Sequence, residues 1–185
     1  MLCLKPKTHF VSNIHTELMF INLGLYRTGT TSLAALFEGE GVALRDLAAV
    51  DDLSDAEFQQ ILVDPASFVR ERWSAGLREQ IFAVLNTGAA LTCDGIFPLL
   101  AFHPSALADL EASFDISWLC THRAVPDLVD SELKHWITFD LEKRLTHAQR
   151  AALPRLLEMR ARAHASEVSK LANVITPLPL ESVHE

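Results

Sequence analysis

The residues with the clearest chemical potential form a loop of glycine and hydroxyl side chains around one arginine, Arg27. The loop is Gly24-Leu25-Tyr26-Arg27-Thr28-Gly29-Thr30-Thr31-Ser32. An apolar run at residues 18–23 precedes it, and residues 32–37 place apolar side chains on one helical face. In a strand–loop–helix turn, the free N–H groups and the dipole of the helix bind anions. Because Arg27 can bridge two phosphate oxygens and the hydroxyls add donors, the loop predicts a phosphate site.

The two glycines of the loop are spaced as in the phosphate loop of nucleoside-triphosphate-binding proteins. Thr30 stands where those proteins carry the lysine that reaches the terminal phosphates, which argues against a kinase or NTPase. Arg27 supplies a positive charge from inside the loop instead. The simpler alternative is a tight turn that caps a core helix, but the strand–loop–helix order favours anion binding.

The segment from Leu23 to Leu33 resembles the 5′-phosphosulfate loop of the sulfotransferase superfamily, in the form common among small bacterial members. These enzymes take a sulfuryl group from 3′-phosphoadenosine 5′-phosphosulfate (PAPS) and release 3′-phosphoadenosine 5′-phosphate (PAP). In the family, the basic residue at the Arg27 position and the hydroxyls after it hold the 5′-phosphate and the sulfuryl group. The resemblance implies that Arg27 acts in catalysis as well as binding. The donor-binding residues that it implies in this loop are Arg27, Thr28, Gly29, Thr30, Thr31 and Ser32.

A second resemblance to the same family lies at the end of a later apolar run. Residues 121–126, Thr121-His122-Arg123-Ala124-Val125-Pro126, together with Ser131, resemble the family's 3′-phosphate element. There an arginine at a strand end and a serine on the next helix bind the 3′-phosphate, which implies that Arg123 and Ser131 complete the donor site. Ligands of open α/β sheets bind at this edge. Taken singly, each residue would also fit an ordinary surface position, and the chain lacks the family's usual Arg-Asp-Pro order.

Sulfuryl transfer also needs a base that takes a proton from the acceptor. Asp94 is the first candidate, because it follows a predicted strand and because residues 93–98 resemble the Asp-x-Pro region of small bacterial sulfotransferase-like proteins. An aspartate before a glycine is equally typical of a turn. His103 is the second candidate, although its position before a proline is more typical of a helix cap. His122 and His135 flank the 3′-phosphate element, and we expect them to shape it rather than to catalyse.

These loops are positioned by strand-like and helix-like segments that alternate along the chain. Strands are expected at residues 18–23, 42–44, 89–93, 116–121 and 173–176. Helices are expected at residues 32–37, 64–86 and 104–113, from Pro126, and from a capping box at Thr146 and Gln149, with a break or restart at Pro154. Strands separated by helix-length segments predict parallel βαβ units. The expected fold is a P-loop α/β three-layer sandwich with a central parallel sheet, in one domain over residues 1–185.

The composition limits the classes of partner. A net charge of −8 argues against nucleic-acid binding, although a local basic pocket can still hold a small anion. No apolar run has membrane length and no signal-peptide core follows the N-terminal lysines, so we expect a cytoplasmic protein without a membrane contact. The scattered cysteines show no metal-ligand spacing, so no metal is expected. Cys93 and Cys120 are expected to be buried free thiols.

The sequence therefore favours an enzyme that moves a sulfuryl group from PAPS to a hydroxyl or amine of a small-molecule or glycan acceptor. Members of the family usually continue past a strand like residues 173–176 into a basic loop that closes over the nucleotide. Residues 181–185 contain no such loop, so a C-terminally short member is expected. Two alternatives stay open: a nucleotide-binding or interaction protein of the same fold with weak catalysis, and a P-loop phosphotransferase that uses ATP or GTP. An acidic, Mg²⁺-binding strand end would favour the phosphotransferase, whereas residues 121–123 are basic.

Overall fold

The computed structural model describes residues 19–45, 47, 53–87, 91–92, 95–171 and 175–179. Within them the chain forms a five-stranded sheet in which all neighbouring strands are parallel. The strands are β1 (Met19–Asn22), β2 (Leu44–Arg45), β3 (Leu91–Thr92), β4 (Ile116–His122) and β5 (Ile175–Pro179). Their order across the sheet is β2-β3-β1-β4-β5. The predicted parallel α/β class is confirmed, and β1, which leads into the arginine-containing loop, is the central strand.

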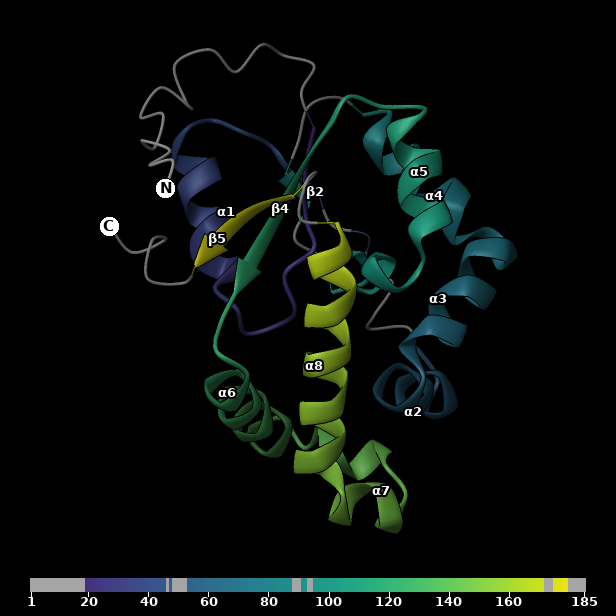
Figure 1. Cartoon of the computed structure of the whole chain (residues 1–185), viewed down its shortest axis with the longest axis vertical. Helices are drawn as coiled ribbons and strands as arrows, with labels where there is room; N and C mark the ends of the chain where they lie inside the picture. Colours follow the sequence, from purple (N-terminus) through teal and green to yellow (C-terminus); the bar gives the residue numbers. More distant parts are fainter. Residues whose placement is uncertain are drawn as a thin grey trace.

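Helices lie on both faces of this sheet (Figure 1). On one face, Leu33 of α1 (Thr30–Gly39) clusters with Phe20 of β1. The helices on the opposite face are α3 (Pro65–Arg72), α4 (Arg78–Leu85) and α5 (Pro104–Glu111). Right-handed crossovers explain this division, because the chain leaves β1 toward β2 and then crosses the sheet in the other direction to reach β3, β4 and β5.

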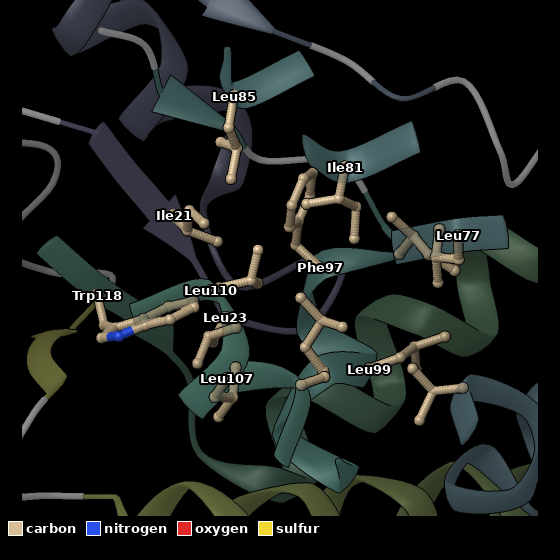
Figure 2. Close-up of a cluster of buried hydrophobic side chains, with 14 of the residues drawn as sticks. Ile21, Leu23, Leu77, Ile81, Leu85, Phe97, Leu99, Leu107, Leu110 and Trp118 are labelled. Atoms are coloured by element: carbon tan, nitrogen blue, oxygen red, sulfur yellow. The ribbon is translucent and has the colours of Figure 1, made fainter. Parts of the chain in front are cut away.

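The larger core fills the space between the sheet and the second helix layer (Figure 2). Successive strand side chains point to opposite faces, so Ile21 and Leu23 enter this core while Phe20 faces α1. Trp118 of β4 joins them. The helical side chains that Figure 2 shows around them are Leu77, Ile81, Leu85, Phe97, Leu99, Leu107 and Leu110, and all are buried. Burial of this set is what attaches the sheet to its helices.

The prediction of a single helix over residues 64–86 is wrong in one respect. It begins as expected at Pro65 with an Asp64 cap, but it is interrupted by a π-helical turn, η1 (Trp73–Leu77). Gly76 lies in this turn with φ at 116°, a conformation that glycine adopts without a Cβ clash. The turn leaves Leu77 and the apolar side chains of α4 facing the core, so the four-residue repeat predicted the buried face but not the break.

Three other elements, one helix and two strands, differ from the prediction. Helix α2 (Asp55–Val63) was not expected, although Ser54 and Glu57 form a capping box at its start. Strand β2 begins at Leu44, where the prediction placed the end of that strand. Strand β5 continues through two prolines that were expected to follow it, and an edge strand tolerates proline because one side needs no ladder hydrogen bonds.

Beyond the carboxyl ends of the strands, α6 (Val125–Thr138), α7 (His147–Ala151) and α8 (Leu153–Lys170) form a helical extension (Figure 1). The predicted capping box at the start of α7 and the restart at Pro154 are confirmed. A second core holds α6 and α8 together with α2; its buried members are Leu62, Trp136, Leu145, Leu153 and Leu157. This extension places α6 and α8 beside the loop that follows β1.

Candidate functional site

The arginine-containing loop is the predicted turn between a strand and a helix. Strand β1 ends at Asn22, and α1 begins at Thr30 with Gly29 as its N-cap at φ 95°. Arg27 also has a positive φ, 70°, which turns the loop sharply before the helix. No side chain caps α1, and its first backbone hydrogen bond runs from Leu33 N–H to the Gly29 carbonyl. The N–H groups of the first turn are therefore available to an anion.

A buried polar network ties this loop to β4. Asn22 is fully buried, and its Oδ1 accepts hydrogen bonds from the backbone N–H groups of Gly24 (3.1 Å) and Thr121 (3.0 Å). Asn22 Nδ2 donates to Thr121 Oγ1 at 3.1 Å, and that hydroxyl lies 2.8 Å from Thr28 Oγ1. Thr28 Oγ1 also donates to the Leu25 carbonyl. The Thr28 hydroxyl, expected to contact the donor, is thus engaged inside the loop, and Asn22 fixes where the loop begins.

Gly24 allows β1 and β4 to approach each other at this point. A Cβ atom on Gly24 would lie within 3 Å of three Thr121 atoms, two of them backbone atoms. Glycine is therefore required here for strand packing, before any contact with a ligand is considered.

Asn22→Ala is expected to lower the free energy of unfolding by about 2–4 kcal/mol, because it leaves two buried N–H groups without an acceptor. Chemical denaturation checks this. Thr138→Ala, which removes an exposed hydroxyl at the end of α6 that bonds only to the Lys134 carbonyl of the same helix, is the control, with an expected change of about 0.5 kcal/mol or less. Equal, small losses in the two variants would contradict the proposed role of Asn22.

The loop after β1 and the loop after β4 open side by side at a topological switch point. The two strands are neighbours, but the chain leaves β1 toward β2 and leaves β4 toward β5, on opposite sides. Such a point forms a crevice at the carboxyl edge of the sheet. The structure brings two predicted donor residues together there: Arg27 Nε donates to Ser131 Oγ of α6 at 3.3 Å.

A pocket of about 340 Å³, here called the strand-end pocket, borders this crevice. Thr28, Thr121 and Arg123 contribute polar groups, and the apolar lining includes Leu128 and Val168. Arg123 makes no hydrogen bond or ion pair with any residue that the structure describes. Its guanidinium is thus available to an anion at the mouth of the pocket.

A second pocket of about 440 Å³, here called the aromatic pocket, lies on the other side of the loop. The two pockets share Leu25 as a lining residue. The aromatic pocket is lined by Tyr26, Phe58, Ile61, Gly95, Pro98, Leu99, Glu132, His135, Trp136, Phe139, Leu141, Arg144 and Arg160. Its walls are chiefly aromatic and aliphatic, which suits an apolar ligand that carries one or two polar groups.

An ion pair between α6 and α8 forms part of the wall of the aromatic pocket. Arg160 Nη2 donates to both carboxylate oxygens of Glu132 at 2.7 Å, and Glu132 is only 1% exposed. Burial raises the pKa of Glu132, while the positive charges of Arg160 and Arg27 oppose this shift. Arg160 Nε is buried and has no hydrogen-bond partner within the described part of the chain.

Two buried groups beside the strand-end pocket are held in their neutral forms. Burial raises the pKa of Cys120 to about 11, so this thiol is a poor nucleophile, and its predicted burial is confirmed. Burial lowers the pKa of His164, on α8, to about 4. His164 is therefore an uncharged member of the pocket wall at neutral pH.

The buried His164 predicts a pH-dependent stability. An unfolded histidine binds a proton near pH 6.5, whereas folded His164 binds it only near pH 4. Between these values the unfolded chain holds more protons, so the free energy of unfolding falls as the pH falls, by about 3 kcal/mol in all. Chemical denaturation across this range should show a shallower pH dependence in His164→Gln than in the parent. The exposed His147→Gln should keep the parent's pH dependence, and an identical profile in all three proteins would contradict the assignment.

Neither of the two candidate bases, Asp94 and His103, is seen beside the donor residues in the described part of the chain. Asp94 and Cys93 lie outside the described residues. His103 is the N-cap position of α5, lines neither pocket, and has a pKa lowered by burial and by the charge of Arg70. Sequence reasoning missed the roles of Asn22 and of the Glu132–Arg160 pair, because each depends on a partner that is distant in the sequence.

Comparisons with protein-family models and with curated proteins find no match for this chain. Among the residues that the structure describes, no helix is long and apolar enough to cross a membrane. Those residues also contain no group of three or more histidine, cysteine or acidic side chains arranged to hold a metal ion.

Proposed function

We propose that this chain is a P-loop protein of the sulfotransferase type, which binds PAPS at the β1–β4 crevice and transfers its sulfuryl group to a hydroxyl or amine acceptor. The observation that carries the proposal is the contact between Arg27 and Ser131 beside the uncapped start of α1. It joins two elements that resemble the two phosphate-binding elements of one family. Arg27 and Ser131 are 104 positions apart in the sequence, so only the fold brings these two elements together.

Sulfuryl transfer requires the protein to position the donor and the acceptor and to stabilise the charge that develops on the leaving phosphate, as in phosphoryl transfer. Arg27 and the N–H groups of α1 would hold the 5′-phosphate and stabilise the charge that develops on it as the sulfuryl group leaves. Arg123, on the β4 side of the crevice, would hold the 3′-phosphate together with Ser131. The nucleotide would thus span the crevice between the loop after β1 and the start of α6.

A thermal-shift screen with PAP, PAPS, ATP and GTP tests the proposal. A ligand at a hundred times its dissociation constant adds about 2.7 kcal/mol to stability, which is readily measured. PAP and PAPS are expected to raise the melting temperature, and ATP and GTP are not. Stabilisation by ATP or GTP alone would favour a phosphotransferase. Binding of PAP without transfer to any acceptor would favour a nucleotide-binding protein with lost catalysis.

Arg123→Ala is expected to remove most of the preference for PAP over adenosine monophosphate, because these ligands differ only in the 3′-phosphate. Affinity for adenosine monophosphate should stay almost unchanged. Ser131→Ala should reduce the preference more weakly, since a hydroxyl contact contributes less than an ionic one. Calorimetric titration of both ligands measures the effect, and Arg155→Ala, an exposed arginine that lines neither pocket, is the matched control. A full preference for PAP in Arg123→Ala would place the 3′-phosphate elsewhere.

A further inference from the structure

A tyrosine and a histidine meet at the wall of the aromatic pocket, beside the predicted donor loop. Tyr26 Oη and His135 Nε2 lie 3.1 Å apart, and the two rings meet edge to face with centroids 4.8 Å apart. The ring of Phe139 also packs against His135, with the two ring centroids 4.4 Å apart. Tyr26 is 44% exposed, so its hydroxyl can meet a ligand while the imidazole behind it is held in place.

This pair lies next to the groups proposed to hold the transferred group. Tyr26 immediately precedes Arg27, whose guanidinium carbon lies 5.9 Å from the centre of the Tyr26 ring. His135 lies one helical turn after Ser131, the partner of Arg27. The Tyr26–His135 and Arg27–Ser131 contacts are therefore parallel bridges from the loop to α6, one at the aromatic pocket and one at the crevice.

Burial and a nearby positive charge both favour the neutral form of His135. Burial lowers the pKa of His135, and the positive charge of Arg27 lowers it further. The other ionisable groups that line the same pocket are Tyr26, Glu132, Arg144 and Arg160. Glu132 and Arg160 are paired with each other, and Arg144 is paired with Asp55. At neutral pH the imidazole can therefore accept a proton.

The walls of the aromatic pocket indicate which acceptor would reach this pair. Phe58, Trp136 and Phe139 provide flat apolar surface, and both cationic side chains are engaged in ion pairs. An uncharged aromatic compound with one hydroxyl group matches these walls and leaves its hydroxyl for Tyr26.

We propose that Tyr26 and His135 form a proton relay that activates a phenolic acceptor bound in the aromatic pocket. This inference rests on the proposed sulfuryl transfer. The acceptor hydroxyl gives its proton to Tyr26 Oη as Tyr26 passes its own proton to His135 Nε2. The acceptor oxygen then forms its bond to sulfur while the bond from sulfur to the 5′-phosphate oxygen breaks, and PAP leaves with that electron pair. His135 later releases its proton to water. Tyr26 touches the acceptor, and His135 acts through it.

Transfer from PAPS to two phenols tests the relay. At mildly alkaline pH, 2-naphthol is still mostly protonated and needs a base, whereas 4-nitrophenol is largely ionised and needs little help. Tyr26→Phe and His135→Gln should each lower kcat/KM for 2-naphthol by about 10²-fold. The double variant should fall no further, because the two residues act as one unit. The rates with 4-nitrophenol should change little, and His147→Gln, on α7, should match the parent.

Two further measurements separate the relay from the donor site. PAP affinity, measured by calorimetry, should be the same in the parent and both relay variants. The loss of kcat/KM toward acid pH, caused by protonation of His135, should disappear in His135→Gln. If the parent does not bind PAP, the proposed function fails and the relay with it. If the parent binds PAP but sulfates neither phenol, or if both variants sulfate 2-naphthol at the parent's rate and with its pH profile, the relay alone is overturned.

Discussion

Arg27→Ala is expected to weaken PAP binding by about 10- to 150-fold, more than any other single substitution in the loop. Charge-assisted hydrogen bonds contribute about 1.5–3 kcal/mol each, and Arg27 is the only charged side chain between residues 24 and 32. Its positive φ and its contact with Ser131 hold the guanidinium at the crevice. Calorimetric titration of the folded variant with PAP measures the loss.

Three companion variants make the Arg27 measurement specific. Thr31→Ala and Ser32→Ala remove uncharged hydroxyl donors from the first turn of α1 and should each cost less than Arg27→Ala, about tenfold or less. Arg155→Ala should leave PAP affinity unchanged. Unchanged affinity in a folded Arg27→Ala variant would show that the loop does not hold the phosphate.

Glu132→Ala is expected to lower the free energy of unfolding by about 3–5 kcal/mol, because it leaves Arg160 buried and without its counter-ion. Arg160→Met should cost less, since the Glu132 carboxyl can take up a proton and become neutral, whereas a guanidinium cannot lose one. Burial already raises the pKa of Glu132, and loss of Arg160 removes the charge that opposes that rise. The stability of Arg160→Met should therefore fall as the pH rises through the raised pKa of Glu132.

Chemical denaturation at several pH values tests this asymmetry. Glu158→Ala breaks a pair with Arg162 on the exposed side of α8, where the two side chains are 47% and 65% exposed, and it should change stability by no more than about 0.5–1 kcal/mol. A stability loss in Glu132→Ala as small as that in Glu158→Ala would contradict the proposed role of the buried pair. A loss in Arg160→Met as large as that in Glu132→Ala would contradict the asymmetry.

Local patterns predicted the framework of the site well. The apolar run before Gly24, the amphipathic segment after it and the run that ends at Thr121 gave a correct strand, loop and helix around Arg27. They did so because short-range alternation and helix starts are encoded by neighbouring residues. The capping residues Asp64 and Thr146 located two helix starts for the same reason.

The features that local patterns did not predict depend on distant partners or on backbone geometry. Asn22 looks like any polar residue at a strand end until Thr121 is beside it. Glu132 looks like a solvent-exposed residue of an amphipathic helix until α8 places Arg160 against it. The π-helical turn at Gly76 keeps the apolar repeat intact, so the repeat gave no sign of it. His135 was expected only to shape the phosphate element, because its contact with Tyr26 spans the loop and α6.

The most direct test of the donor site compares the dissociation constants of the unmodified chain for PAP and for adenosine monophosphate. The two ligands share every group except the 3′-phosphate, which Arg123 and Ser131 are proposed to hold. A charge-assisted clamp on that phosphate predicts that PAP binds at least about tenfold more tightly. Equal affinity for the two ligands would contradict the sulfotransferase assignment even if the loop after β1 binds phosphate, and binding of neither ligand would contradict the nucleotide site itself.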